Sequence, residues 1–257
     1  MTSEPSRTAA RVVLATRASA DAARLLAEAG TLARALRAEL AGVFVEESDL
    51  LRLAALPMCR EVGFSSGTVR AIDLASTLRQ FERQAAEVRR LVAQTAAGFE
   101  VPWSFTVERG TVLEVAVAAA EGPDVALLAP PRGALGRTVG AAGHRTGTTV
   151  GVFYDGGPAG DRALAAALEL VQHHPEVLTL VVPDAADPLP LRRRAAGLLG
   201  VAGRLPDAVA SRELRRRPAR ALVVSVGSLV GNGGADPRRP DLRRLLASAP
   251  CPLVLVR

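Results

Sequence analysis

The sequence contains no lysine, few aromatic residues and only two cysteines. Aromatic residues make up 3% of the chain, with one tryptophan and one tyrosine. Cys59 and Cys251 form no CxxC motif, which favours a protein that keeps its thiols reduced. No uncharged apolar stretch reaches about 18 residues, so we expect no membrane span. The first residues, MTSEPSRTAARVV, lack the apolar core of a secretory signal. We therefore expect a cytoplasmic protein.

All basic charge is carried by arginine, and it is unevenly distributed. Residues 1–147 hold 17 arginines against 16 acidic residues, a net charge of +1, whereas residues 148–257 hold 15 against 10, a net charge of +5. The excess lies in Arg192–Arg194, Arg215–Arg217 and two pairs, Arg238–Arg239 and Arg243–Arg244. Such clusters could bind nucleic acid in a salt-dependent way. No aromatic residue for base stacking accompanies them, so we favour a solvated surface.

The most informative positive feature is an internal repeat. Residues 11–36 and 149–173 each consist of a short apolar run, a turn of small residues and a stretch with helical periodicity. Two further apolar runs follow in each half, at 38–47 and 124–131 and at 176–184 and 221–228. A repeat of strand–turn–helix–strand units predicts two similar α/β domains. We place them at residues 8–147 and 148–257.

The periodicity predicts individual elements in both halves. Ser19 is the expected N-cap of the first helix, and Gly98 the expected stop of a long helix over 73–97. Residues 46–72 form a long excursion with a helical part at 49–56 and a loop at 63–67. The other predicted strands are 11–16, 40–45, 103–107, 125–129, 150–154, 177–182, 208–211, 222–226 and 252–256, and the other helices are 111–120, 161–173, 189–199 and 241–248.

Four phrases of the sequence resemble one family. RVVLATRAS looks like its first strand and turn, AGVFVEESDLLRLAALP its second strand and loop, VERGTVLEVAVAAAEGPDVALLA its third strand, helix and fourth strand, and APCPLVLVR its closing strand. Together they resemble the universal stress protein family in its tandem two-domain form. The resemblance implies two open, mostly parallel Rossmann-like sheets with flanking helices, packed as a pseudo-dimer within the chain, with a homodimer as a further option. We expect the first domain to lack its last helix and strand, because Thr149–Tyr154 follows Gly143 within a few residues; the alternative is that the run at 150–154 is shared between the domains.

Family members that bind ATP carry an Asp just after the first strand and a loop G-x2-G-x9-G-[ST] after the fourth. Glycines let backbone N–H groups approach phosphates, and the hydroxyl opens a helix whose N-terminus favours anions. Both halves depart from this pattern. In the first, Arg17 replaces the Asp, and the loop reads Pro130-x2-Gly133-x9-Gly143-His144. In the second, Asp155 is present, but the loop reads Gly227-x2-Val230-x9-Pro240-Asp241.

The resemblance therefore makes adenine nucleotide the candidate ligand, with no cofactor assigned firmly to either half. The candidate nucleotide-binding residues are Arg17, Arg132, Gly133, Gly143, Asp155 and Gly227. In the first half, Arg17 and Arg132 beside the surviving glycines could hold phosphates. Asp241 would repel a phosphate, and a helix N-cap is its better role.

Other polar residues give weaker signals. Glu46, Glu47 and Asp49 could bind a cation, although a polar loop or helix start is the simpler interpretation. We expect His173 and His174 to be exposed at a helix end, and we assign no metal ligand. Cys59 has little around it that would make a reactive thiol.

No Ser-His-Asp order, P-loop or GxGxxG appears after a strand, and we assign no catalytic residue. We expect a non-catalytic stress-response or regulatory binding protein with degraded nucleotide sites. One alternative is a universal stress protein that binds or hydrolyses ATP, with Asp155 positioning the metal. Another is a module that binds a protein or nucleic acid through the basic second half. The sequence identifies neither the partner nor the oligomeric state.

Overall fold

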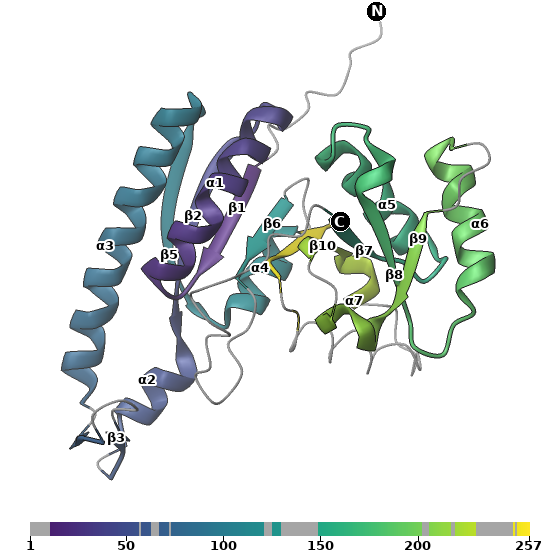
Figure 1. Cartoon of the computed structure of the whole chain (residues 1–257). Helices are drawn as coiled ribbons and strands as arrows, with labels where there is room; N and C mark the ends of the chain where they lie inside the picture. The colour runs from purple at the N-terminus through teal and green to yellow at the C-terminus, as the bar shows by residue number, and fades with distance from the viewer. Residues whose placement is uncertain are drawn as a thin grey trace, which may run out of the picture. The chain divides into compact units, whose positions relative to one another are not determined.

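The computed structural model describes residues 11–56, 58–62, 67–71, 73–120, 125–129, 149–201, 206–216, 219–229, 249 and 251–257. The chain divides into two compact units, Arg11–Ala116 and the unit that begins at Val117. Both are built from mostly parallel strands with flanking helices (Figure 1). In the described part of the chain, no helix has the length and apolar content of a membrane-crossing segment.

The unit Arg11–Ala116 carries three parallel strands in the order β5-β2-β1. The long helix α3 packs beside α1 on these strands (Figure 1). The excursion after β2 contains α2 and a small antiparallel pair, β3 and β4. The bounds are β1 Arg11–Thr16, α1 Ser19–Leu36, β2 Glu39–Glu47, α2 Ser48–Ala54, β3 Arg60–Val62, β4 Val69–Ala71, α3 Leu74–Phe99 and β5 Trp103–Gly110; α4, Val112–Ala120, crosses into the next unit.

Helix α3 forms where its apolar periodicity predicts it. Asp73 is the N-cap, and its Oδ1 accepts a hydrogen bond from the Ser76 N–H at 2.8 Å. The buried face carries Phe81, Ala85, Val88 and Val92, spaced three or four residues apart. The helix ends at Phe99, and its C-cap is Glu100, with a left-handed φ of 56°, rather than Gly98. The prediction of Gly98 as the stop was therefore wrong.

Helix α1 also begins differently from the prediction. Its N-cap is Ala18, not Ser19, and no side chain caps it. The turn before it is instead held by Thr16, whose Oγ1 donates to the Ala18 carbonyl at 2.9 Å and accepts from the Ala18 N–H at 3.3 Å. A local hydroxyl-to-backbone bond of this kind replaces the expected cap.

In its described residues, the second unit has six strands in the order β6-β11-β10-β7-β8-β9. All neighbours are parallel except β11 and β6, which pair antiparallel with Val254 opposite Leu127. The bounds are β6 Val125–Leu128, β7 Thr149–Phe153, α5 Pro158–Leu170, η1 Pro175–Val177, β8 Leu178–Val182, α6 Pro188–Leu199, β9 Asp207–Ala210, η2 Ser211–Arg216, β10 Ala219–Ser225, α7 Val226–Leu229 and β11 Leu253–Val256.

The predicted fold class, mostly parallel α/β sheets with flanking helices, is confirmed. Strands β7, β8 and β9 have the same neighbour order as β1, β2 and β5. The unit boundary differs from the predicted one between residues 147 and 148, because β6 pairs with β11 and so belongs to the later unit. The helix predicted at 241–248, and the stretch that decides whether the first domain lacks its last helix and strand, lie outside the described residues.

Candidate functional site

The polar residues of the first unit gather where its parallel strands end. Parallel strands direct their carboxyl ends to one edge of a sheet, which is where ligands of such folds bind. Arg17 follows β1, Glu46 and Glu47 end β2, and Arg109 lies near the end of β5. The register places Glu46 opposite Arg109. Arg17, Glu46, Glu47 and Arg109 together form what we call the first edge.

The charges of the first edge neutralise one another. Arg17 Nη1 lies 2.5 Å from Glu47 Oε1, and both side chains are about one-third exposed, at 37% and 31%. Arg109 Nε donates to Glu46 Oε2 at 2.9 Å. Glu46 is the more buried partner, with 15% of its side chain exposed. Each arginine therefore already has a carboxylate partner from the neighbouring strand.

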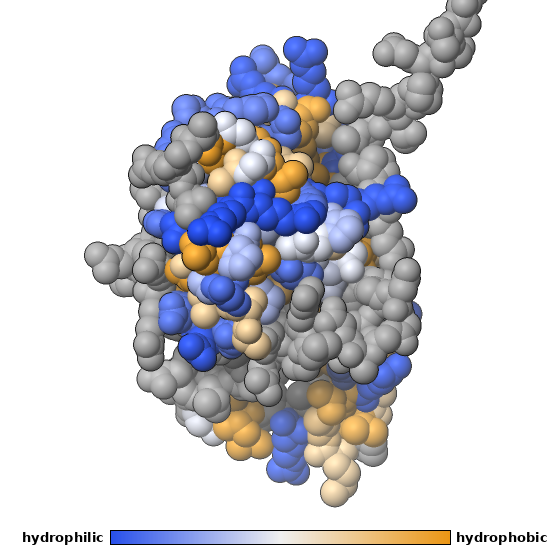
Figure 2. All heavy atoms as spheres, turned by 90° about the vertical axis from the view of Figure 1, so that its right-hand side faces the viewer, coloured by the Kyte–Doolittle hydropathy of each residue, from blue (hydrophilic) through white to orange (hydrophobic). Residues whose placement is uncertain are grey.

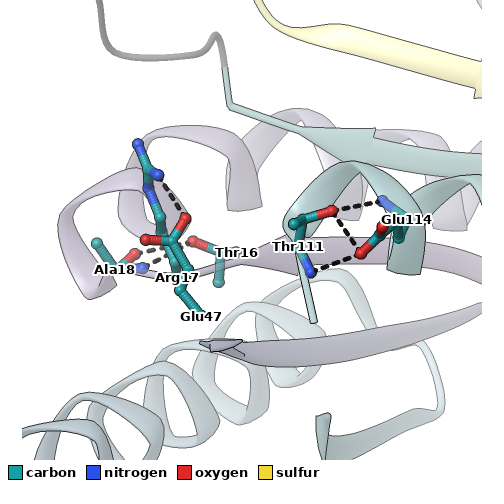
Figure 3. A network of polar contacts seen from close by, with 6 residues as sticks. All are labelled: Thr16, Arg17, Ala18, Glu47, Thr111 and Glu114. Atoms are coloured by element: carbon teal, nitrogen blue, oxygen red, sulfur yellow. Dashed lines mark hydrogen bonds and ion pairs between the residues drawn. The ribbon is translucent and has the colours of Figure 1, made fainter. Parts of the chain in front are cut away.

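Two local motifs fix the turns around the first edge: the Thr16–Ala18 hydrogen bonds after β1 and a capping box at the start of α4 (Figure 3). Thr111 and Glu114 form a capping box at the start of α4: the Glu114 N–H donates to Thr111 Oγ1 at 3.2 Å, and Glu114 Oε2 accepts from the Thr111 N–H at 3.1 Å. The Thr111 hydroxyl also donates to Glu114 Oε2 at 2.8 Å. The Glu114 carboxylate therefore caps the start of α4.

The equivalent edge of the second unit begins at Asp155, directly after β7. Its Oδ1 accepts a hydrogen bond from the Gly157 N–H at 2.9 Å. A Cβ at Gly160 would lie only 2.8 Å from the same Oδ1, so the carboxylate lies against the first turn of α5. The positive end of the helix dipole stabilises a carboxylate there. These two contacts of Asp155 thus serve the turn from β7 into α5.

Gly227 lies just after β10 and is approached closely by an arginine from α5. Arg162 Nη2 would be 2.7 Å from a Cβ at Gly227, so a side chain there would displace the guanidinium. Arg162 Nε donates to the Arg257 carbonyl at 3.2 Å, which holds it across the end of β11. The Gly227 N–H donates to Ser225 Oγ at 3.3 Å. At this edge, the guanidinium of Arg162 therefore lies directly over Gly227.

A buried phenol joins two helices of the second unit. Tyr154 is fully buried, and its hydroxyl donates to Asp161 Oδ1 at 2.9 Å. Arg194 of α6 donates to Asp161 Oδ2 at 2.6 Å and to Oδ1 at 3.3 Å. Burial, followed by the bond to Asp161, raises the pKa of Tyr154 to about 12. The hydrogen bond from Arg194 is the main reason that the pKa of Asp161 is lowered.

The arginine cluster 192–194 is partly structural. Arg192 Nε donates to the Pro206 carbonyl at 2.6 Å, and Arg194 pairs with Asp161. Arg193 is exposed on the same helix, which also carries the exposed Leu189 and Leu198. The side of the second unit that carries α6 shows hydrophilic and hydrophobic side chains interspersed (Figure 2). The side chains of the other predicted arginine clusters lie outside the description.

The structure thus describes three of the six predicted nucleotide-binding residues. Arg17 is at the first edge, and Asp155 and Gly227 are at the edge of the second unit; Arg132, Gly133 and Gly143 lie outside the described residues. No group of three or more potential metal ligands occurs among the residues that were placed. His173 and His174 are exposed at the end of α5, as predicted, and contact Glu169 and Glu176.

Sequence reasoning missed the partners of these residues. The Arg17–Glu47 and Tyr154–Asp161–Arg194 contacts join elements that are separated along the chain. Only the acidic residues Glu46, Glu47 and Asp49 stood out in the sequence, which was compatible with either a cation site or a polar loop. The structure makes all three carboxylates ion-pair partners of arginines: Glu47 of Arg17, Glu46 of Arg109 and Asp49 of Arg52.

No protein-family model matches the sequence, and no curated protein sequence does. A universal stress protein from Archaeoglobus fulgidus DSM 4304 is similar in structure, with a TM-score of 0.55, 15% sequence identity and 96% of each chain covered. The chain has the fold of a universal stress protein. A protein from Pseudomonas aeruginosa UCBPP-PA14 described as a universal stress protein aligns with 96% of this chain and 93% of its own, at 12% identity. Its TM-score is 0.41.

Proposed function

We propose that the chain is a universal-stress-protein-like binding protein that has no catalytic activity and whose nucleotide sites have degraded. Its role would be regulatory, in a stress response. The observation that carries the proposal is the Arg17–Glu47 ion pair at the end of β1. The resemblance to ATP-binding family members calls for a nucleotide-contacting Asp at that position, and here an arginine bound to a carboxylate takes its place.

The first edge disfavours a polyphosphate. Glu46 and Glu47 bring two carboxylates to it, and their arginine partners cancel rather than exceed that charge. An unshielded carboxylate and a phosphate oxygen about 4 Å apart repel by about 1 kcal/mol in water and about 4 kcal/mol at an effective dielectric constant of about 20. A nucleotide would therefore have to break an ion pair before Arg17 could bind its phosphates.

At the carboxyl edge of the second unit's sheet, Asp155 supports the proposal, whereas Arg162 supports the alternative of ATP binding. The Asp155 carboxylate is bound to the start of α5, which competes with a contact to a nucleotide base. Arg162 covers Gly227, so a phosphate must displace it to reach the backbone. Its charge would nevertheless attract an anion. ATP binding at this edge is therefore the second candidate.

Isothermal titration with ATP and Mg²⁺ separates the two candidates. The proposal expects no saturable heat from the wild-type protein and none from Asp155→Asn or Arg162→Ala. Arg193→Ala removes an exposed arginine from α6 and is the matched control for net charge. Saturable binding that is lost in Asp155→Asn and Arg162→Ala but kept in Arg193→Ala would overturn the proposal in favour of ATP binding.

A phosphate-release assay tests the non-catalytic part separately. The proposal expects phosphate release from Mg²⁺-ATP to equal the rate without protein. Turnover that scales with protein concentration and falls in Asp155→Asn would establish an ATPase and contradict the proposal.

A further inference from the structure

Strand β5 is an open edge of the first unit's sheet. Its only neighbour among the described strands is β2. It runs for eight residues, longer than most strands, and its first five residues, Trp103 to Val107, are uncharged. Trp103 is 40% exposed and Val107 is 47% exposed. Proteins usually protect such edges with charges, proline, bulges or short strands, because an unprotected edge pairs readily with another strand.

The backbone of this edge is oriented for pairing. The Pro102 carbonyl accepts a hydrogen bond from the Leu40 N–H at 2.9 Å, so the main-chain groups of Pro102 face β2. Main-chain direction alternates along a strand. The N–H and C=O groups of Trp103, Phe105 and Val107 therefore point away from β2, toward the open side.

The side chains of the same three residues share one face of the sheet. A Cβ at Gly42 would lie 3.2 Å from Phe105 Cδ2 and 2.7 Å from Val92 Cγ2 of α3, which places Phe105 on the face that α3 covers. Trp103 and Val107 are two residues away on either side and lie on that face too. The edge thus combines outward main-chain groups with a row of apolar side chains.

We propose that β5 pairs antiparallel with β5 of a second copy of this chain, about a two-fold axis at Phe105. This register sets Phe105 opposite the same residue of the other copy and Trp103 opposite Val107. The outward N–H and C=O groups then meet in hydrogen-bonded pairs. A two-fold contact closes on itself, so it gives a dimer and not a fibre.

The charges near the strand agree with this occupant. Counting from the two-fold axis at Phe105, Glu108 falls opposite Pro102 and Arg109 opposite Val101, so no like charges face each other across the contact. On the other face Ser104 falls opposite Thr106, a polar pair that can hydrogen-bond across strands. The strand therefore sets apolar positions opposite apolar ones and polar opposite polar ones in its own antiparallel copy, with no like charges opposed.

Two substitutions at Val107 test the pairing. Val107→Pro removes an N–H that faces the open side and leaves the bonds to β2, a placement that edge strands tolerate. Val107→Lys puts a charge on the apolar row while keeping the backbone intact. The matched control is Val69→Lys on β4, which changes a valine that is 54% exposed away from β5.

Sedimentation equilibrium over a wide concentration range gives the decisive readout. The wild-type chain and Val69→Lys should form a dimer, and both Val107 variants should raise its dissociation constant about tenfold or more, because the two-fold axis repeats each change. Trp103 is the only tryptophan, so dilution of the wild-type dimer should shift its fluorescence to longer wavelength. A wild-type chain that stays monomeric, or a dimer that both Val107 variants leave intact, would overturn the proposal. So would a dimer that Val69→Lys weakens equally.

Discussion

Replacing Tyr154 with phenylalanine should change how stability depends on pH. Tyr154 is the only tyrosine, it is fully buried, and its hydroxyl donates to Asp161 at 2.9 Å. At neutral pH, Tyr154→Phe removes a hydrogen bond to a charged group, which contributes about 1.5–3 kcal/mol. The Asp161–Arg194 ion pair remains in the variant, so the fold should be kept.

The direction in which stability changes at alkaline pH follows from the pKa shift of Tyr154. The pKa of Tyr154 is raised from 10.0 to about 12, mainly by burial, so the folded state favours the neutral phenol. Below pH 10 this stabilisation is fully present. Between pH 10 and about 12 the unfolded chain ionises first, and about 2–3 kcal/mol is lost, at about 1.4 kcal/mol per pKa unit. Tyr154→Phe has no phenol to ionise, so its stability does not fall for this reason.

Urea denaturation of both proteins from pH 7 to pH 12 measures the effect. The stability advantage of the wild-type protein over Tyr154→Phe should shrink above pH 10 and be largely gone near pH 12. Burial also raises the pKa of Cys251 to about 12, and both proteins share that contribution, so only their difference reports on Tyr154. A difference that stays constant up to pH 12 would refute the reasoning, as would phenolate absorbance that titrates near pH 10 in the folded protein.

Other substitutions should act on stability in opposite directions, measured by urea denaturation at neutral pH. Gly160→Ala should destabilise by about 1–3 kcal/mol, because its Cβ would meet Asp155 Oδ1 at 2.8 Å, whereas Gly197→Ala meets nothing within 4 Å and should stabilise by up to about 1 kcal/mol. Glu100→Gly should stabilise by about 0.5–1 kcal/mol, because φ is 56° there. Glu47→Gln, which breaks the pair with Arg17, should destabilise by about 0.2–1 kcal/mol, and by less at high salt.

A specific result would contradict each of these predictions. Gly160→Ala as stable as Gly197→Ala would mean that the turn after β7 is not tightly packed. A destabilising Glu100→Gly would mean that the Glu100 side chain contributes more than its backbone strain costs. A Glu47→Gln effect that is unchanged by salt would show that the pair is not an exposed ion pair.

The sequence predicted most strands and helices because their apolar periodicity is strong. Helix α3 and strands β1, β7 and β8 lie within a few residues of the predicted ranges. The weak candidate at 208–211 is strand β9, Asp207–Ala210. The β3–β4 pair was missed because strands of three residues are too short to show alternation. Helix α5 begins three residues early, at Pro158, since proline suits the first helical position.

The site was less predictable than the fold. Periodicity placed Arg17, Glu47 and Asp155 at strand ends, but it could not pair Arg17 with Glu47 or direct Asp155 toward α5, because those contacts depend on how neighbouring elements pack. The exposure of β5 was also hidden, since an alternating strand has the same sequence pattern at an edge as beside another strand.

The most direct test of the account is to measure what the protein carries when it is purified. Charged side chains pair with one another at the first edge, and Asp155 and Arg162 bind backbone groups at the edge of the second unit, in place of a nucleotide. Mass spectrometry of the small molecules released on denaturation should find adenine nucleotide far below one molecule per chain. One ATP per chain, retained through purification and lost in Asp155→Asn, would contradict it.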